Sequence, residues 1–192
     1  MKTISVPFYG ATIDSISQTY HGKHPALDMV CSSKTSPLGY GTPLTAPEDC
    51  EVLRITGDTY TPGSSGNLKR GYGIYLTGLE TGCTHFFWHT LPIMPVNVGQ
   101  KVSRGKIVAF MGNAGAVYSN DNYVPLSERT TPPYNGTHLH WEMMGPGYIF
   151  TEPKNWVNPL DYIDWGSFPA YSNYDFLKAS SVVLGKIVGL VS

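Results

Sequence analysis

The sequence predicts a mainly β, loop-rich protein with one domain, and three observations lead to this fold class. Five short runs are rich in β-branched or aromatic residues and are bounded by turn residues. The chain contains 21 glycines and 15 prolines, which suit turns between short strands better than long helices. With 192 residues, 41% of them hydrophobic, the chain is long enough to bury one sizeable core.

The predicted strands are separated by turn and loop residues. They cover residues 51–56, 73–77, 84–88, 106–111 and 139–143. Strand residues two positions apart point to the same face of a sheet, which predicts that His85, Phe87 and His89 share one face of the third strand.

The C-terminal end has a different pattern, in which apolar residues repeat with helical spacing after Ser180. The run is too short to cross a bilayer, which needs about 20 apolar residues, and no stable membrane span is expected. Two alternatives stand for residues 180–192: a helix packed on its own domain or on a second copy, or a connector that attaches the chain to a larger polypeptide or particle. We therefore predict a C-terminal connector and amphipathic helix over 166–192.

Charge and cysteine content exclude several classes of function. The formal net charge is −1 and only 14% of residues are charged, which does not indicate a nucleic-acid or anionic-membrane surface. Cys31, Cys50 and Cys83 are odd in number and have no C-x-x-C spacing, so neither a disulfide framework nor a cysteine zinc site is implied. We expect small buried residues in a protein made in a reducing compartment.

Three separated clusters carry the most specific chemistry. His24 and Asp28 lie in H-P-A-L-D, His89 in F-F-W-H-T, and His138 and His140 in T-H-L-H-W-E. Two imidazoles and one carboxylate can bind a catalytic zinc ion, and two histidines remain for proton transfer. These five residues are of the types that form the active site of a metal-dependent hydrolase.

The spacing of these residues constrains the local structure. His138 and His140 are two positions apart in a predicted strand, so both imidazoles reach one site. On an ideal strand His24 and Asp28 would be about 13 Å apart, too far to share one ion. Either a bend at Pro25 or a single helical turn, in which residues four apart are neighbours, would bring them together.

From about His24 to Tyr162 the chain resembles the LytM/lysostaphin-type zinc endopeptidases of peptidoglycan, the M23 or β-lytic family. The similar segments are H-x-x-x-D, G-T-P-L-T-A-P at 41–47, G-Y-G at 71–73, F-F-W-H-T-L at 86–91, the glycine-punctuated run 96–115, T-H-L-H-W-E at 137–142 and N-P-L at 158–160. The resemblance implies antiparallel sheets that form an open groove, a barrel-sandwich hybrid. It also implies a zinc peptidase domain at 1–165, with its core at 20–162.

The resemblance assigns roles position by position. It implies one Zn²⁺ ion held by His24, Asp28 and His140, and it makes His89 and His138 the catalytic pair. One histidine would take a proton from the attacking water, while the other would stabilise the oxyanion or protonate the leaving amine. We favour His138 as the base, although sequence alone does not divide the two roles.

Three further residues have a weaker claim on the site. The family often uses a tyrosine near the site to stabilise the oxyanion, and Tyr20 is the candidate here. Glu142 could orient His140, or it could be a solvated strand carboxylate. His85 could brace the site, or it could be a solvent-facing or core histidine.

One departure from the family pattern bears on specificity. The short link that the family has before H-L-H is replaced here by a long polar segment, residues 116–137. Loops of this length in a compact domain usually carry function. We therefore predict that segment 116–137 forms one wall of the substrate groove, and bond preference cannot be taken over from better-known relatives.

The predicted function is a zinc endopeptidase that cuts stem or cross-bridge peptides of bacterial peptidoglycan. One alternative is a noncatalytic wall-binding or activator module of the same fold. Another is a lipoyl- or biotin-carrier-like domain, which would need Lys101 or Lys106 at a hairpin tip and would leave the histidines unexplained.

The route to the cell wall also follows from the sequence as an expectation. The first seven residues, M-K-T-I-S-V-P, lack the apolar run of a signal peptide. We therefore expect a virion-associated phage protein or a lysin released from an infected cell. A domain whose signal lies elsewhere in a longer protein is the alternative.

Overall fold

The computed structural model describes residues 3–31, 39–57, 71–119, 122–131, 134–147 and 155–167. The strands of these residues are β1 (Ile16–Gln18), β2 (Ala26–Met29), β3 (Pro43–Thr45), β4 (Cys50–Thr56), β5 (Tyr72–Gly78), β6 (Thr84–Thr90), β7 (Lys101–Val102), β8 (Ile107–Phe110), β9 (Tyr118–Ser119), β10 (Asn122–Tyr123) and β11 (Leu139–Met144). The short helices are η1 (Ile13–Ser15), α1 (Leu126–Arg129) and η3 (Pro159–Asp161). The five predicted strands correspond to β4, β5, β6, β8 and β11, which confirms them.

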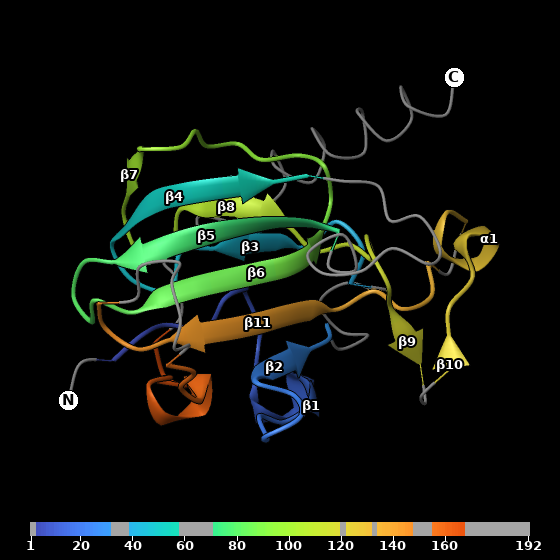
Figure 1. Ribbon diagram of the computed structural model, residues 1–192, viewed down its shortest axis with the longest axis horizontal. Coiled ribbons are helices and arrows are strands. Elements are labelled where there is room, and N and C mark those ends of the chain that lie inside the picture. The colour runs from blue at the N-terminus through green and yellow to red at the C-terminus, as the bar shows by residue number, and fades with distance from the viewer. Residues whose placement is uncertain are drawn as a thin grey trace.

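Within the described residues, one antiparallel sheet has the strand order β1-β2-β11-β6-β5-β4-β7 (Figure 1). The pairs β3–β8 and β9–β10 form separate two-stranded sheets, and the described strands do not close into a barrel. The prediction of a mainly β protein with a large antiparallel sheet is confirmed. The predicted C-terminal helix and the connector at 166–192 fall almost wholly outside the described residues, and the domain boundary at 165 stays a prediction.

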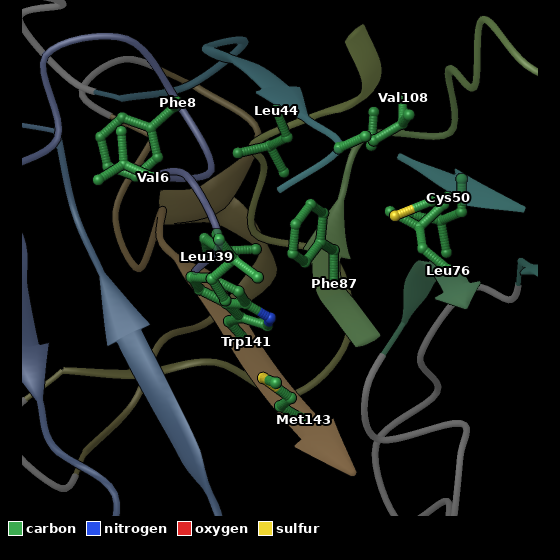
Figure 2. Packing of buried hydrophobic residues seen from close by; sticks show 14 of the residues in the cluster. Val6, Phe8, Leu44, Cys50, Leu76, Phe87, Val108, Leu139, Trp141 and Met143 are labelled. Carbon is green, nitrogen blue, oxygen red and sulfur yellow. The ribbon is translucent and has the colours of Figure 1, made fainter. Parts of the chain in front are cut away.

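The main core lies on one face of the large sheet. Leu139, Trp141 and Met143 of β11 are fully buried there, together with Phe87 of β6 (Figure 2). Leu44 and Val108 from the β3–β8 pair pack on the same core, as do Val6 and Phe8 near the N-terminus. Burial of a large apolar side chain stabilises a fold by about 1.5–3 kcal/mol, so the alternation along β11 fixes which face each residue takes.

The alternate residues of β11 face the other way. His140 and Glu142 lie between the core residues in sequence, and their side chains therefore point to the opposite face. A smaller cluster, which includes Phe86, Trp88 and Met144, is buried on that face. The core thus orients β11 with its polar residues toward the site.

Two smaller predictions concern cysteines and membranes. Cys50 and Cys83 are buried, as predicted, whereas Cys31 is only partly buried. No helix in the described part of the chain is long and apolar enough to cross a membrane.

Candidate metal centre and groove

Asp28 and His140 are brought together by strand pairing. They are directly opposite each other in the β2–β11 ladder, and both side chains emerge on the face away from the main core. Nδ1 of His140 lies 2.8 Å from Oδ1 of Asp28. The register of two strands therefore positions these two side chains without help from a loop.

His24 reaches the same carboxylate through a bend. His21 and His24 exchange two backbone hydrogen bonds in a tight turn, and Pro25 separates this turn from β2. Nε2 of His24 lies 3.2 Å from Oδ2 of Asp28. The bend at Pro25 is therefore correct, and the helical turn that also fitted the sequence is wrong.

The three side chains fit a divalent metal ion. One donor atom from each of His24, Asp28 and His140 lies within 4.8 Å of the other two. Donors about 2.0–2.2 Å from a tetrahedral ion are separated by roughly 3.3–3.5 Å, so a small adjustment suffices. Oδ1 of Asp28 is buried, and Nδ1 of His140 lies 2.8 Å from it. An N, N, O donor set of this kind is typical of zinc.

Glu142 contacts the imidazole of His140 and is itself bound by Trp88. Nε2 of His140 lies 3.2 Å from Oε1 of Glu142, and Nε1 of Trp88 donates to Oε2 at 3.2 Å. Glu142 is 1% exposed, so of the two alternatives for this residue the orienting acceptor is the one that the geometry supports. Because Nε2 donates to Glu142, Nδ1 is the nitrogen of His140 that remains for a metal.

The charges around His140 control its protonation. Burial lowers the pKa of His140, but the hydrogen bonds to Asp28 and Glu142 outweigh this effect and raise it to about 9. Burial likewise raises the pKa of Asp28, but hydrogen bonds from His140 and His24 hold it well below the usual range. The metal-free centre is therefore a carboxylate beside a protonated imidazole, and an ion must displace the Nδ1 proton.

His89 reaches the site because β6 bulges. Tyr72 and Gly73 of β5 pair with Thr90 and Trp88, so His89 is the extra residue of the ladder, and its φ is +59°. The sequence predicted that His89 shares a face with His85 and Phe87, and that prediction is wrong, because the bulge turns His89 to the other face. Bulges re-aim side chains beside functional sites, and the His89 ring lies 4.7 Å, centroid to centroid, from that of His138.

His89 and His138 share the same tautomer. Nδ1 of His89 donates to the carbonyl of Ala114 at 2.6 Å, and Nδ1 of His138 donates to that of Gly136 at 2.9 Å. Burial lowers the pKa of both rings below the usual value, so each is neutral at pH 7 with an unprotonated Nε2. Nε2 of His138 lies 3.8 Å from Oδ2 of Asp28. These are the properties of a general base next to the metal ligands.

Donor atoms of His89, His138 and His140 also lie within 4.8 Å of one another and could hold a metal. We assign the ion to the group that contains Asp28, because its carboxylate brings a negative charge to a divalent cation, whereas the other group offers imidazoles only.

The centre lies in a groove with a volume of about 710 Å³. Ser17, Gln18 and Lys23 line one part of it. Residues of segment 116–137 line another part, namely Ala116, Tyr118, Ser119, Gly136 and Thr137. Described residues of this segment therefore line the groove, as predicted, and substrate binding along them stays a prediction.

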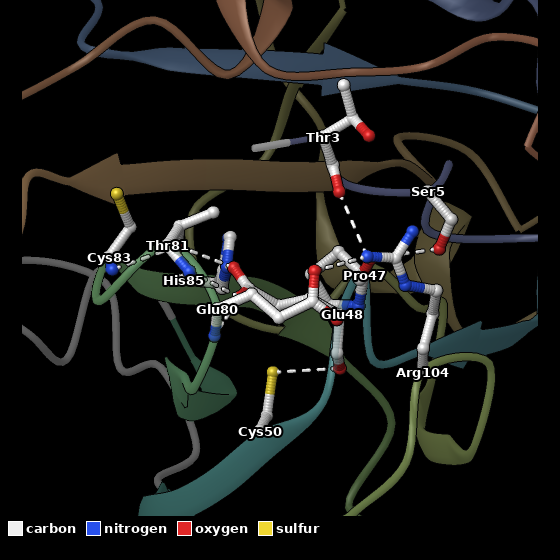
Figure 3. A network of polar contacts seen from close by, with 10 residues as sticks. All are labelled: Thr3, Ser5, Pro47, Glu48, Cys50, Glu80, Thr81, Cys83, His85 and Arg104. Carbon is white, nitrogen blue, oxygen red and sulfur yellow. Dashed lines mark hydrogen bonds and ion pairs between the residues drawn. The ribbon is translucent and has the colours of Figure 1, made fainter. Parts of the chain in front are cut away.

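Two of the weaker predicted site residues do not line the groove. The Tyr20 hydroxyl lies 3.5 Å from the carbonyl oxygen of Trp156. His85 is fully buried on the core face, and its Nε2 lies 3.0 Å from Oε1 of Glu48, which also accepts from Thr81 (Figure 3). His85 is therefore the core histidine that the sequence left as an alternative.

Sequence reasoning missed several residues that support the centre. Trp88 was noted only as part of a motif, although it fixes Glu142. Arg129 and Ala114 were not singled out, yet the Ala114 carbonyl accepts from His89, and Arg129 donates to the carbonyl of the next residue, Gly115. No local pattern marks them, because their partners are distant in sequence.

Comparison with known proteins gives structural matches only. The sequence matches no family model and no curated protein. A zinc-containing peptidase from Vibrio cholerae has a TM-score of 0.55 at 16% identity, covering 83% of this chain and 40% of that one. Helicobacter pylori Csd3 has a TM-score of 0.52 at 16% identity, covering 96% and 38%. The antimicrobial peptidase lysostaphin from Staphylococcus simulans has a TM-score of 0.51 at 18% identity, covering 84% and 53%.

The chain thus spans between 38% and 53% of the length of these three structures. Identities this low establish the arrangement of strands and nothing finer. On that ground, the chain has the fold of the LytM/lysostaphin-type M23 peptidases.

Proposed function

We propose that the protein is a zinc-dependent endopeptidase that hydrolyses stem or cross-bridge peptides of bacterial peptidoglycan. The observation that carries this proposal is the convergence of His24, Asp28 and His140 beside two neutral imidazoles in one groove. The shared fold with lysostaphin and with a zinc-containing peptidase supports it. A noncatalytic module would not need His89 and His138 at this position, and both are present.

The residues suggest a division of labour in peptide hydrolysis. When bound, zinc supplies Lewis acidity, which acidifies water and polarises a carbonyl. His138 is the proposed base, because its free Nε2 lies beside the ligand carboxylate and can take a proton from the attacking water. His89 is the proposed stabiliser: its unprotonated Nε2 accepts the second proton of the attacking water, and the resulting imidazolium donates to the tetrahedral oxyanion and passes this proton to the leaving amine.

Muropeptide analysis tests the reaction class directly. Zinc-loaded protein should release new amino termini from purified cell walls, and chelation should abolish this until zinc is restored. His140→Ala should remove both bound zinc and activity. His21→Ala is a matched control, because His21 is exposed in the same turn as His24 but belongs to neither group of donors. Equal wall hydrolysis by metal-stripped protein would exclude the proposal.

Metal analysis separates the enzyme from the noncatalytic alternative. The proposed enzyme binds one zinc ion per chain, and His140→Ala binds none. A protein that binds walls without taking up zinc would support the noncatalytic module instead.

A further inference from the structure

A buried arginine lies in the wall segment 116–137. Arg129 ends α1 and is 5% exposed. Its Nη1 donates to the carbonyl oxygens of Asn113, at 3.1 Å, and of Gly115. Its Nη2 donates to the hydroxyl of Tyr123 at 3.0 Å. One guanidinium thus joins the wall segment to the backbone that precedes it.

The side chain of Asn113 in turn binds the backbone of Arg129. Its Nδ2 donates to the carbonyl of Arg129 at 3.0 Å and to that of Asn135 at 3.1 Å. Asn113 is 8% exposed, so the hydrogen bonds are largely shielded from water. The two side chains form a reciprocal clasp between residues 113–115 and the wall segment.

The clasp encloses the partner of His89. Ala114 lies between the two residues whose carbonyls accept from Arg129, and its own carbonyl accepts from Nδ1 of His89 at 2.6 Å. On another side the backbone of Ala114 and Gly115 packs against Gly71, where a Cβ would lie 2.4 Å from the Gly115 nitrogen. The Ala114 carbonyl is therefore held by contacts on more than one side.

The chemistry of arginine suits this position. Its planar fork can donate to several acceptors in fixed directions, whereas a lysine ammonium is a point charge on a flexible stem. The acceptors recorded for Arg129 are neutral oxygens, so desolvation of the guanidinium is offset by these hydrogen bonds and by the Tyr123 ring, whose centroid lies 5.5 Å from Cζ. An arginine placed there at such a cost indicates a need to fix the backbone of 113–115.

We propose that Arg129 is a positioning residue for His89. By holding the Ala114 carbonyl, it fixes the Nδ1–H tautomer and the ring orientation of His89, and leaves Nε2 free toward the groove. The wall segment then has a second role, because it orients one of the two proton-transfer histidines. The effect on catalysis rests on the proposed function, but the effect on the His89 ring does not.

Variants of Arg129 in the zinc-loaded protein test this proposal. Arg129→Met removes all N–H donors of the guanidinium, and Arg129→Lys keeps the positive charge but loses the planar arrangement of donors. We expect both to lower kcat by roughly tenfold to a hundredfold, with KM and zinc stoichiometry almost unchanged. Tyr123→Phe is the matched control, because it removes the Nη2 bond but keeps the aromatic ring beside the guanidinium and both carbonyl contacts of Nη1.

The second readout is the ring ¹⁵N spectrum of His89. In wild type and Tyr123→Phe it should show protonation at Nδ1, and in the two Arg129 variants a mixture of tautomers. A folded Arg129→Met protein with an unchanged His89 spectrum would overturn the proposal, and Arg129→Lys decides the matter if the methionine variant does not fold. If zinc-loaded wild type fails to cleave walls, the proposed function fails while the spectrum still tests the positioning.

Discussion

Nε2 of His140 and Oε1 of Glu142 are 3.2 Å apart, and this contact ties the metal centre to the interior of the sheet. The second oxygen of the carboxylate accepts from Trp88, whose ring packs over Gly73 of β5. A ligand histidine held this way keeps one tautomer and one ring orientation, which raises its affinity for a metal. The centre therefore depends on packing two strands away from it.

Glu142→Gln should weaken zinc binding by about tenfold to a hundredfold. The amide keeps the volume of the side chain, but only its oxygen can accept, so either His140 or Trp88 loses its partner. Competition with a chromophoric chelator at constant pH measures the affinity. Glu51→Gln is the control, because Glu51 lies on β4 and away from the groove. Equal losses of zinc affinity in the two variants would show that Glu142 does not orient His140.

Zinc affinity should rise with pH up to about pH 9. Hydrogen bonds to Asp28 and Glu142 raise the pKa of His140 to about 9 in the metal-free protein. Below that pH the ion must displace a proton from Nδ1, and this competition costs about tenfold in affinity per pH unit. Titrations between pH 6.5 and 9 measure the slope. A flat profile over this range would show that His140 is already neutral.

His140 should also make the metal-free protein less stable as pH rises, whereas zinc affinity increases with pH. The folded pKa of His140 is above the usual 6.5, so its contribution to stability is fully present below pH 6.5 and is lost as pH rises through about 9. Thermal melts of metal-free protein should therefore shift to lower temperature across this window. His140→Ala should shift less over the same range.

Gly73→Ala should destabilise the protein by about 1–3 kcal/mol. A Cβ at Gly73 would lie 2.5 Å from Cε3 of Trp88 and 2.7 Å from the carbonyl oxygen of Phe87. The indole would have to move, and the Trp88–Glu142 hydrogen bond would weaken with it. Urea unfolding of metal-free protein gives the free energy. Gly22→Ala is the control, because a Cβ there meets nothing within 4 Å, and an equal loss in both variants would contradict the packing argument.

Sequence predicted the parts of this site that depend on strand periodicity. The two-residue spacing of His138 and His140 predicted that both imidazoles reach one site, because alternate residues of a strand point to the same face, and both line the groove. The same rule failed at His89, where a bulge with a positive φ turns the ring to the other face. A bulge depends on how two strands pair, so the sequence of either strand alone does not reveal it.

The burial of charged side chains could not be predicted from the sequence either. Arg129 lies in a polar segment where an arginine is normally solvated, and it is buried only because residues 113–115 fold against it. Glu48 follows a proline in what reads as a turn, yet its carboxylate is fully buried against Gly78. Burial of a polar side chain is decided by distant segments, so local patterns do not reveal it.

Glu48 should make the protein sensitive to acid. Burial raises the pKa of Glu48, but hydrogen bonds from His85 and Thr81 outweigh this effect and lower it to about 2 (Figure 3). Because this is below the ordinary 4.5, the carboxylate stabilises the fold above about pH 4.5, and its contribution is lost as pH falls toward 2. The loss amounts to about 3 kcal/mol over that window.

The test compares two isosteric variants of metal-free protein by urea unfolding at pH 5 and near pH 2. Glu48→Gln should be less stable than wild type at pH 5, by at least about 2 kcal/mol, because the amide nitrogen cannot accept from Thr81 or His85. The difference should shrink toward pH 2, where wild type also loses its carboxylate. Glu80→Gln alters only a surface pair with Arg104 and should follow wild type at both pH values. If Glu48→Gln and wild type lost the same free energy between the two pH values, Glu48 would not be the acid-sensitive group.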